Sequence, residues 1–364
     1  MTAVVPEYRC GAAPDSHRVP SSAPETQGQP TTHQLYLAHF GRVNTITSDA
    51  MPLSTIPGDF LRGANLPWVN YVDFGANAWH PDGGLAREPW RSQALAAVRR
   101  LADSGAQVVR WWVLGDGRAG IVWDAHGHAR GLDAAFFDDL DTAVEMVAGL
   151  GLRMLPVLLD ALWCQPGRVV DGVLIGGRRG VLRHAEPRGH LLERVIEPIL
   201  ARYGSHPAVL AWDVINEPDL VTRGCWPSVP PTALAPEPMR DFIAAAVERV
   251  HGLTAHAATV GLGNARHLPL VRDLGLDLYQ VHWYDVNDRW SPLDTAVGAW
   301  GLDAPILLGE FPTRRSRRQP LEVERAARRA GYAGALAWSL LAADEFTDGA
   351  ACAAFLAGSG SAPG

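Results

Sequence analysis

Apolar and polar positions follow two different patterns along most of this chain. From residue 59 onward, short runs that are apolar at nearly every position alternate with longer stretches in which apolar residues recur every three or four positions. The first pattern is typical of strands buried on both faces, and the second indicates amphipathic helices. Strands are predicted over 60–66, 107–114, 153–160, 208–217, 257–263, 277–284, 305–310 and 334–340. Helices are predicted over 92–105, 138–151, 190–204, 239–253 and 321–331.

The order of these segments predicts an α/β fold. Buried strands separated by helices indicate a parallel sheet covered by helices. Eight such units favour a single closed (β/α)8 TIM barrel over an open doubly wound sheet. No GxGxxG motif follows the first strand and no GxxxxGK[ST] motif occurs, which argues against dinucleotide and P-loop folds. We therefore expect one domain over residues 56–358, with only weak helical patterns at 264–274 and 291–301.

The first 55 residues differ in composition from the rest. They are rich in Pro, Ser, Thr, Gln and Gly and show little periodicity, so residues 1–55 are predicted to form a disordered N-terminal extension. The alternative is that translation begins at Met51. The N-terminus lacks a basic segment followed by an apolar run of about 7–15 residues, which is the pattern of a secretory signal. We therefore expect a cytoplasmic protein.

Composition and charge exclude several classes of function. The chain has 364 residues, of which 47% are hydrophobic, so it can bury a large core. A net charge of −7 gives no electrostatic reason to bind nucleic acid or an anionic membrane. No apolar run reaches the roughly 18 residues that a membrane-spanning helix needs. We expect a monomer with neither nucleic acid nor membrane as a partner.

The cysteines do not indicate a metal site. Cys10, Cys164, Cys225 and Cys352 form no CxxC pair, and no histidine stands at zinc-finger spacing. Cys164 and Cys225 follow neighbouring predicted strands, so the sequence is compatible both with free thiols and with a disulfide between them.

Two glutamates stand at strand ends, where barrel enzymes place their active sites. The fourth predicted strand ends in Asn216-Glu217-Pro218, and the seventh ends at Glu310. Two carboxyl groups facing each other are what cleavage of a glycosidic bond requires, one protonated and the other ionised. A neighbouring cation such as Arg110 would keep one of them ionised. We expect Glu310 to be the ionised partner and Glu217 the protonated one.

These motifs resemble those of glycoside hydrolase family 5 and its clan A, the cellulase- and β-mannanase-like retaining enzymes. The resemblance spans residues 59 to about 345 and rests on LRGANL, VVRWWV, WDVINEP, VHWY, LLGEF and the tryptophan of AWSLL. It implies that Glu217 is the general acid/base and Glu310 the nucleophile. It also implies that the chain is a retaining β-glycoside hydrolase that needs no metal or organic cofactor.

The resemblance extends to residues that would bind the substrate. It implies that Asn216 binds the sugar 2-hydroxyl, that Arg110 and Tyr284 flank the nucleophile, and that His282 and Trp338 line the site of the cleaved sugar. Trp163 and Asp160 follow and end the third strand, and we add them as candidate substrate contacts. Many cellulase-type members have a histidine at the position of Asp160, so contacts there are expected to differ.

The substrate would be a β-linked glucan, a mannan or a smaller glycoside. The absence of an export signal motivates an alternative, an intracellular transglycosylase or tailoring enzyme that acts on a small glycoside. A second alternative is a non-catalytic carbohydrate-binding barrel, although a binder would gain nothing from keeping both glutamates. Asp213 is expected to support the barrel rather than to catalyse. The basic run at 314–318 is either a solvated helix entrance or a contact for an anionic substrate group.

Overall fold

The computed structural model describes residues 60–358. The expectations for residues 1–55, a disordered extension or a start at Met51, lie outside the described residues. Within residues 60–358, no helix is both long enough and apolar enough to cross a membrane.

Eight parallel strands close into a barrel and follow one another around it in chain order. This arrangement confirms the predicted (β/α)8 fold, and all eight predicted strands are present. The barrel strands are β1 (Leu61–Leu66), β2 (Val108–Trp112), β5 (Arg153–Asp160), β8 (Ala211–Asn216), β9 (Ala257–Leu262), β10 (Leu278–His282), β11 (Ile306–Pro312) and β12 (Gly334–Trp338).

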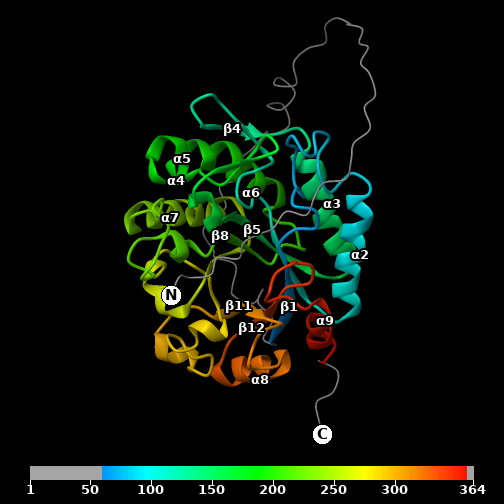
Figure 1. Ribbon diagram of the computed structural model, residues 1–364, viewed down its shortest axis with the longest axis vertical. Coiled ribbons are helices and arrows are strands. Elements are labelled where there is room, and N and C mark those ends of the chain that lie inside the picture. Colours follow the sequence, from blue (N-terminus) through cyan, green and yellow to red (C-terminus); the bar gives the residue numbers. More distant parts are fainter. Residues whose placement is uncertain (1–59, 359–364) are drawn as a thin grey trace, which may run out of the picture. The chain divides into compact units, whose positions relative to one another are not determined.

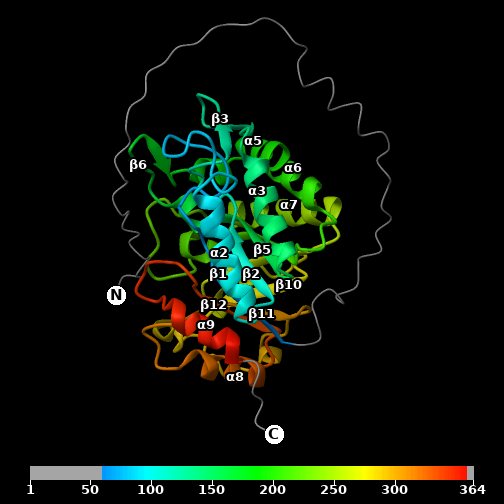
Figure 2. The same ribbon diagram turned by 90° about the vertical axis from the view of Figure 1, so that its right-hand side faces the viewer.

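Helices cover the outside of the barrel, as Figures 1 and 2 show. In Figure 1, α2 and α3 lie on one side of the strands, and α4, α5 and α7 lie on the other. The helices are α2 (Trp90–Asp103), α3 (Phe136–Gly149), α4 (Arg179–Arg183), α5 (Ala185–Leu191), α6 (Glu197–Tyr203), α7 (Pro236–Leu253), α8 (Pro320–Ala330) and α9 (Gly349–Ala357). Helix α8 begins at Pro320 behind a capping box formed by Gln319 and Glu322, and it ends before Gly331 in a left-handed conformation.

Some segments differ from the prediction. The helix predicted over 190–204 is interrupted by a π-helical segment, η3 (Leu192–Ile196), just before Pro198, which lacks the N–H of a regular turn. The two segments with weak helical patterns, 264–274 and 291–301, contain short 3-10 turns, η5 (Ala265–Leu270) and η7 (Val297–Trp300). Two hairpins were not predicted. They are β3 (Ile121–Trp123) with β4 (Ala129–Leu132), and β6 (Arg168–Val170) with β7 (Val173–Ile175).

The interior of the barrel changes from apolar to polar along the strands. Alternate residues of a strand face inward, and the N-terminal inward positions form a small apolar cluster that includes Leu61, Val108 and Leu278. The next inward polar residues along the same strands are Asn65, Arg110 and Gln280, all buried. This polar layer lies at the carboxyl ends of the strands, where barrel active sites form.

Candidate active site

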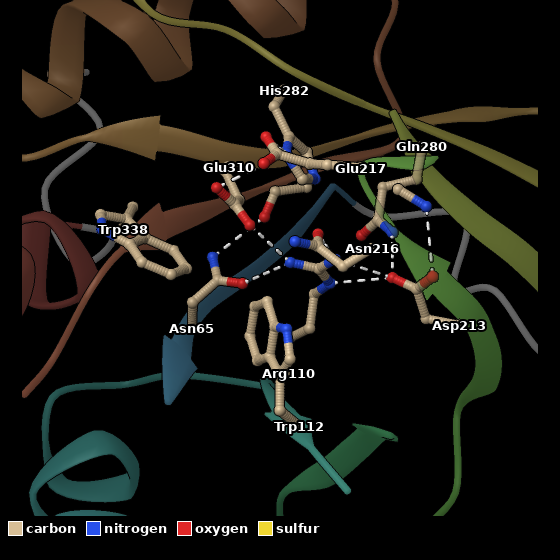
Figure 3. A network of polar contacts seen from close by, with 12 residues as sticks. Asn65, Arg110, Trp112, Asp213, Asn216, Glu217, Gln280, His282, Glu310 and Trp338 are labelled. Atoms are coloured by element: carbon tan, nitrogen blue, oxygen red, sulfur yellow. Dashed lines mark hydrogen bonds and ion pairs between the residues drawn. The ribbon is translucent and has the colours of Figure 1, made fainter. Parts of the chain in front are cut away.

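Arg110 is the centre of the polar layer. Its side chain is completely buried, and Figure 3 shows it between Asn65 and Asp213. Nη1 donates to Oε1 of Glu310 at 2.8 Å and to Oδ1 of Asn65 at 2.9 Å. Burial alone would lower the pKa of Arg110, but the carboxylates of Asp213 and Glu310 outweigh this effect and raise it. Arg110 is therefore a permanent cation that orders the groups around it.

Asp213 accepts several hydrogen bonds at the base of the site. Nε and Nη2 of Arg110 donate to its Oδ2 at 3.0 and 2.8 Å. Nε2 of Gln280 donates to the same atom at 2.6 Å, and the N–H of Gly261 donates to Oδ1 at 3.2 Å. These contacts agree with the supporting role that the sequence predicted for Asp213. Gln280 and Asn65 were not predicted as site residues. The period-2 spacing from Gln280 to His282 could have indicated that Gln280 faces inward together with His282.

Irregular strand pairing turns Asn216 on β8 and Glu310 on β11 toward the barrel interior. Leu307 belongs to the barrel interior, so strict alternation would turn Glu310 outward. The pairing of β10 with β11 skips Gly309, and the pairing of β8 with β9 is irregular between Asp213 and Asn216. An extra residue in one strand re-aims the side chains that follow it. These irregularities explain why Asn216 and Glu310 reach the interior.

Glu310 is held by groups from two other strands, Arg110 on β2 and His282 and Tyr284 at the end of β10. Besides Arg110, the hydroxyl of Tyr284 donates to Oε2 at 3.0 Å, and Nδ1 of His282 lies 3.4 Å from the same oxygen. Burial raises the pKa of Glu310 to about 7, although Arg110 and the Tyr284 hydroxyl oppose the rise. Burial raises the pKa of Tyr284 well above its ordinary value, so this phenol keeps its proton and acts as a donor.

Glu217 directly follows β8 in an unusual backbone conformation. It has φ 49° and ψ 45°, a left-handed region that non-glycine residues seldom occupy. Its side chain is 21% exposed, whereas that of Glu310 is only 4% exposed. Oε1 of Glu217 lies 2.9 Å from Nδ1 of His282. Burial lowers the pKa of His282 to about 4, so the imidazole is neutral near pH 7.

The two catalytic candidates differ in proton affinity. Burial and the negative charge of Asp160 raise the pKa of Glu217 to about 8. The corresponding value for Glu310 is about 7. Glu310 has the hydroxyl of Tyr284 and the cation of Arg110 as direct donors, whereas the hydrogen-bond partner of Glu217 within residues 60–358 is the neutral ring of His282. These contacts favour the ionised form of Glu310 over that of Glu217, which is the assignment expected from the sequence.

Asn216 is fixed by contacts on both sides. Its Oδ1 accepts from Nη2 of Arg110 at 2.6 Å, and its Nδ2 donates to Oδ2 of Asp160 at 2.8 Å. Nε1 of Trp112 also donates to Oδ2 of Asp160 at 2.8 Å. Asp160 thus orients Asn216 and Trp112, so its position fits a supporting contact more closely than a direct ligand.

The aromatic candidates have different environments. Trp338 lies edge-on to Trp112, with ring centroids 5.7 Å apart, and its Nε1 donates to Asp344 at 2.8 Å. Figure 3 shows both indoles near Arg110 and Glu310. Trp163, by contrast, has no exposed surface and packs beside Trp123. The expectation that Trp163 contacts substrate was therefore wrong, because the turn η2 (Ala161–Cys164) places its indole in the core.

Two further alternatives from the sequence are decided by the structure. Cys164 and Cys225 are both free thiols. Arginines of the basic run pair with surface carboxylates, which favours the solvated helix entrance. The pairs are Arg315 with Glu345, Arg317 with Asp285, and Arg318 with Asp294.

Glu217, His282 and Glu310 are also close enough to act as metal ligands. One ligand atom from each lies within 4.8 Å of the others, and two carboxylates with an imidazole are a familiar donor set for zinc. Arg110 and Tyr284, however, already donate to the two oxygens of Glu310. A guanidinium in contact with a ligand opposes a second cation, so the arrangement fits proton transfer better than metal binding.

Comparison with known proteins finds relatives of one kind. No family model matches the chain. The chain is 22% identical over 338 residues to a mannan endo-1,4-beta-mannosidase of Cryptopygus antarcticus. The alignment covers 79% of this chain and 82% of the relative. The crystal structure of endo-1,4-beta-mannanase from Eisenia fetida superposes with a TM-score of 0.70 at 19% identity, over 82% of this chain and 90% of the other.

A family 5 structure is also among the neighbours. The GH5_18 enzyme of Streptomyces cattleya, in complex with Manb1-4GlcNAc, superposes with a TM-score of 0.59 at 13% identity, over 83% of this chain and 80% of that one. Together with the mannanase relatives, this similarity confirms the expected resemblance to glycoside hydrolase family 5 and its clan.

Proposed function

We propose that this β-glycoside hydrolase of the family 5 kind cleaves β-1,4-linked mannan or shorter β-mannosides with retention of configuration. One observation carries the retaining mechanism. A carboxylate oxygen of Glu217 lies within 4.8 Å of one of Glu310. Retaining enzymes place their two carboxyl groups about 5–5.5 Å apart, whereas inverting enzymes need about 6.5–9.5 Å to admit a water molecule.

The reaction proceeds in two displacements. Glu310 attacks the anomeric carbon as Glu217 gives its proton to the departing glycosidic oxygen, so the C–O bond to the leaving group breaks and an ester to Glu310 forms. Glu217, now ionised, takes a proton from water, and the resulting hydroxide equivalent displaces Glu310 from the anomeric carbon. The higher pKa of Glu217, about 8 against about 7 for Glu310, suits this division of roles.

The neighbouring side chains assist each carboxyl. Arg110 and Tyr284 orient Glu310 for attack, and His282 orients Glu217. Asn216 has one amide N–H engaged by Asp160, and its second N–H is left for the sugar 2-hydroxyl.

The substrate and the working unit are also proposals. The choice of mannan follows from the relatives, which are mannan endo-1,4-beta-mannosidases, and the indole of Trp338 supplies an aromatic surface beside the carboxyls. We propose that it works as a monomer, because the acid, the nucleophile and the groups that orient them are already assembled at the end of one barrel. The acidic balance of the chain supports the absence of a nucleic-acid partner.

One experiment tests the reaction and its residues together. The protein is incubated with β-1,4-mannan, with aryl β-mannosides and β-glucosides, and with a 2-deoxy-2-fluoro-β-mannosyl fluoride. We expect turnover of the mannosides, a product that is initially the β-anomer by NMR, and a fluorosugar label on the peptide that contains Glu310. Glu310→Gln should abolish both turnover and label, whereas Glu248→Gln, at an exposed helix position, should preserve both.

The contrary outcomes identify the alternatives. Label on another residue, or an α-anomer as first product, would overturn the assigned roles. Sugar binding without turnover or label would favour a carbohydrate-binding barrel. Transfer of the sugar to an added acceptor in preference to water would favour a transglycosylase.

A further inference from the structure

Asp219 is a buried carboxyl group two residues beyond Glu217, and the proposed reaction does not use it. It has no exposed surface and lies in the turn η4 (Pro218–Val221), directly after Glu217. Oδ1 accepts from the N–H of Gly263 at 2.9 Å, and Oδ2 accepts from Nε1 of Trp226 at 2.9 Å. Asp219 therefore ties the turn after strand β8 to the segment that follows strand β9.

This turn holds Glu217 in its left-handed conformation. A non-glycine residue in that region is strained and persists only where the surroundings impose it. The N–H of Glu217 donates to Gly261 at 2.6 Å, and its carbonyl accepts from Leu220 at 3.0 Å. The contacts of Asp219 anchor the same turn from its other side, so they contribute to the direction in which Glu217 points.

The two carboxyl groups also lie close to the same glycine. A Cβ placed on Gly263 would lie 3.2 Å from Oδ2 of Asp219 and 3.3 Å from Oε1 of Glu217. With no side chain on Gly263, nothing from that residue separates the two groups. Like charges this close in a buried setting disfavour simultaneous ionisation.

Asp219 is the better stabilised anion of the pair. Two N–H groups donate to it, whereas the hydrogen-bond partner of Glu217 within residues 60–358 is the ring of His282. Burial and the charge of Glu217 raise the pKa of Asp219, and its two N–H donors oppose this rise. Because these donors stabilise the anion of Asp219, the last proton of the pair resides on Glu217.

We propose that Asp219 is a positioning residue for Glu217, which it both fixes in direction and, through its negative charge, keeps protonated until the glycosidic oxygen takes the proton. This inference rests on the proposed function, in which Glu217 is the proton donor. Asp219 touches no reacting atom itself.

Other charged or titratable groups face this pair from the surrounding elements. They are Arg110 on β2, Asp160 on β5, Cys225 after η4, Arg266 and His267 on η5, His282 on β10, and Glu310 on β11. Nε2 of His267 lies 4.0 Å from Asp219, and burial together with Arg266 lowers the pKa of this histidine to about 4. His267 is therefore neutral near pH 7, and the anions besides Asp219 that act on Glu217 are Asp160 and the ionised Glu310.

Asp219→Asn tests the charge without changing the shape of the side chain. The basic limb of the pH profile of kcat/KM should move to lower pH by about one unit, because loss of the anion eases ionisation of Glu217. Gly263→Ala tests position instead, since its methyl group would press on both carboxyls while their charges remain. We expect it to lower kcat about 10- to 100-fold at every pH and to leave the basic limb in place.

A matched control separates this effect from general damage. Asp139 is a buried carboxyl that accepts N–H groups of Gly75, Gly84 and Ala86 away from the site. Asp139→Asn should lower thermal stability and leave both limbs of the profile unchanged. If Asp219→Asn does not fold, Trp226→Phe removes one donor to Asp219, favours its protonated form, and should move the basic limb in the same downward direction.

The outcomes distinguish this inference from the proposed function. A basic limb that disappears in Glu217→Gln on activated substrates, but stays in place in Asp219→Asn or in its substitute Trp226→Phe, would overturn the role of Asp219 alone. A basic limb that persists in Glu217→Gln would instead overturn the assignment of Glu217 as proton donor, and with it both statements.

Discussion

Arg110 donates two N–H groups to Asp213, at 3.0 and 2.8 Å, but only one to Glu310, at 2.8 Å. The single guanidinium is thus largely neutralised by a carboxylate that takes no part in the proposed reaction. Burial raises the pKa of Glu310 to about 7, and the shared guanidinium of Arg110 offsets only part of that rise. Asp213 thereby controls how much positive charge reaches the nucleophile.

Asp213→Asn should move the acid limb of the kcat/KM profile to lower pH. Without its anionic partner, Arg110 would act more fully on Glu310 and favour its ionised form. The same change leaves a buried cation incompletely paired, so we expect a loss of about 2–4 kcal/mol in the free energy of unfolding. Activity across pH and urea denaturation measure the two effects. An acid limb that stays in place or moves upward would refute the charge argument.

The unchanged protein should show a bell-shaped dependence of kcat/KM on pH. Activity requires Glu310 ionised and Glu217 protonated, so it rises as pH passes the lower apparent pKa, near 7, and falls as pH passes the upper one, near 8. The two values belong to the interacting pair. Initial rates at low substrate concentration from pH 4 to 10 provide the test. A plateau that extends above pH 9 would contradict the assignment of Glu217 as the acid.

The fold was predictable from the sequence because each barrel strand is nearly uniformly apolar. The third strand was predicted at its observed bounds, 153–160, since Asp160 marks its end. The hairpins at 121–132 and 168–175 were missed because their strands are only three or four residues long. Runs this short carry too little periodicity to distinguish a hairpin from a loop.

The site was predictable in its residues but not in all of its geometry. The sequence places Glu217 directly after β8, Glu310 in the C-terminal half of β11 and Arg110 within β2. A strict period of two, however, would turn Asn216 and Glu310 away from the interior, and only the irregular pairing at these positions brings them inside. Trp163 was misplaced for a related reason, because a residue after a strand can turn toward the mouth or toward the core.

The proposed acid should destabilise the folded chain at alkaline pH. Its pKa of about 8 in the folded state exceeds the ordinary value of 4.5, so the folded protein binds a proton that the unfolded chain has lost above pH 4.5. The free energy of unfolding therefore decreases as pH rises from about 4.5 to 8. Glu217→Gln should raise the melting temperature at pH 9 by a few degrees relative to the unchanged protein and should change it little at pH 4.

Glu324 provides the opposite case as a control. It is paired with Arg62 and Arg328, and these hydrogen bonds outweigh burial and lower its pKa. Its contribution to stability is present above its ordinary pKa and is lost as pH falls. Glu324→Gln should therefore lower the melting temperature at pH 9. If both variants shifted the melting temperature in the same direction, the linkage argument for Glu217 would fail.

Gly309 should tolerate no side chain, because the bulge that turns Glu310 inward brings its Cα against Gln280. A Cβ at this position would overlap the Gln280 side chain, and that side chain donates to Asp213 at 2.6 Å. We expect Gly309→Ala to lower the free energy of unfolding by about 1–3 kcal/mol and kcat about 10- to 100-fold, since Gln280, Asp213 and then Arg110 must shift.

Gly180→Ala is the matched control. A Cβ on this helical glycine of α4 would meet nothing within 4 Å, and alanine favours a helix over glycine. The Gly180→Ala variant should have an unchanged kcat and an unchanged or slightly higher melting temperature. Equal effects of the two substitutions would show that the close approach of Gly309 to Gln280 does not order the site.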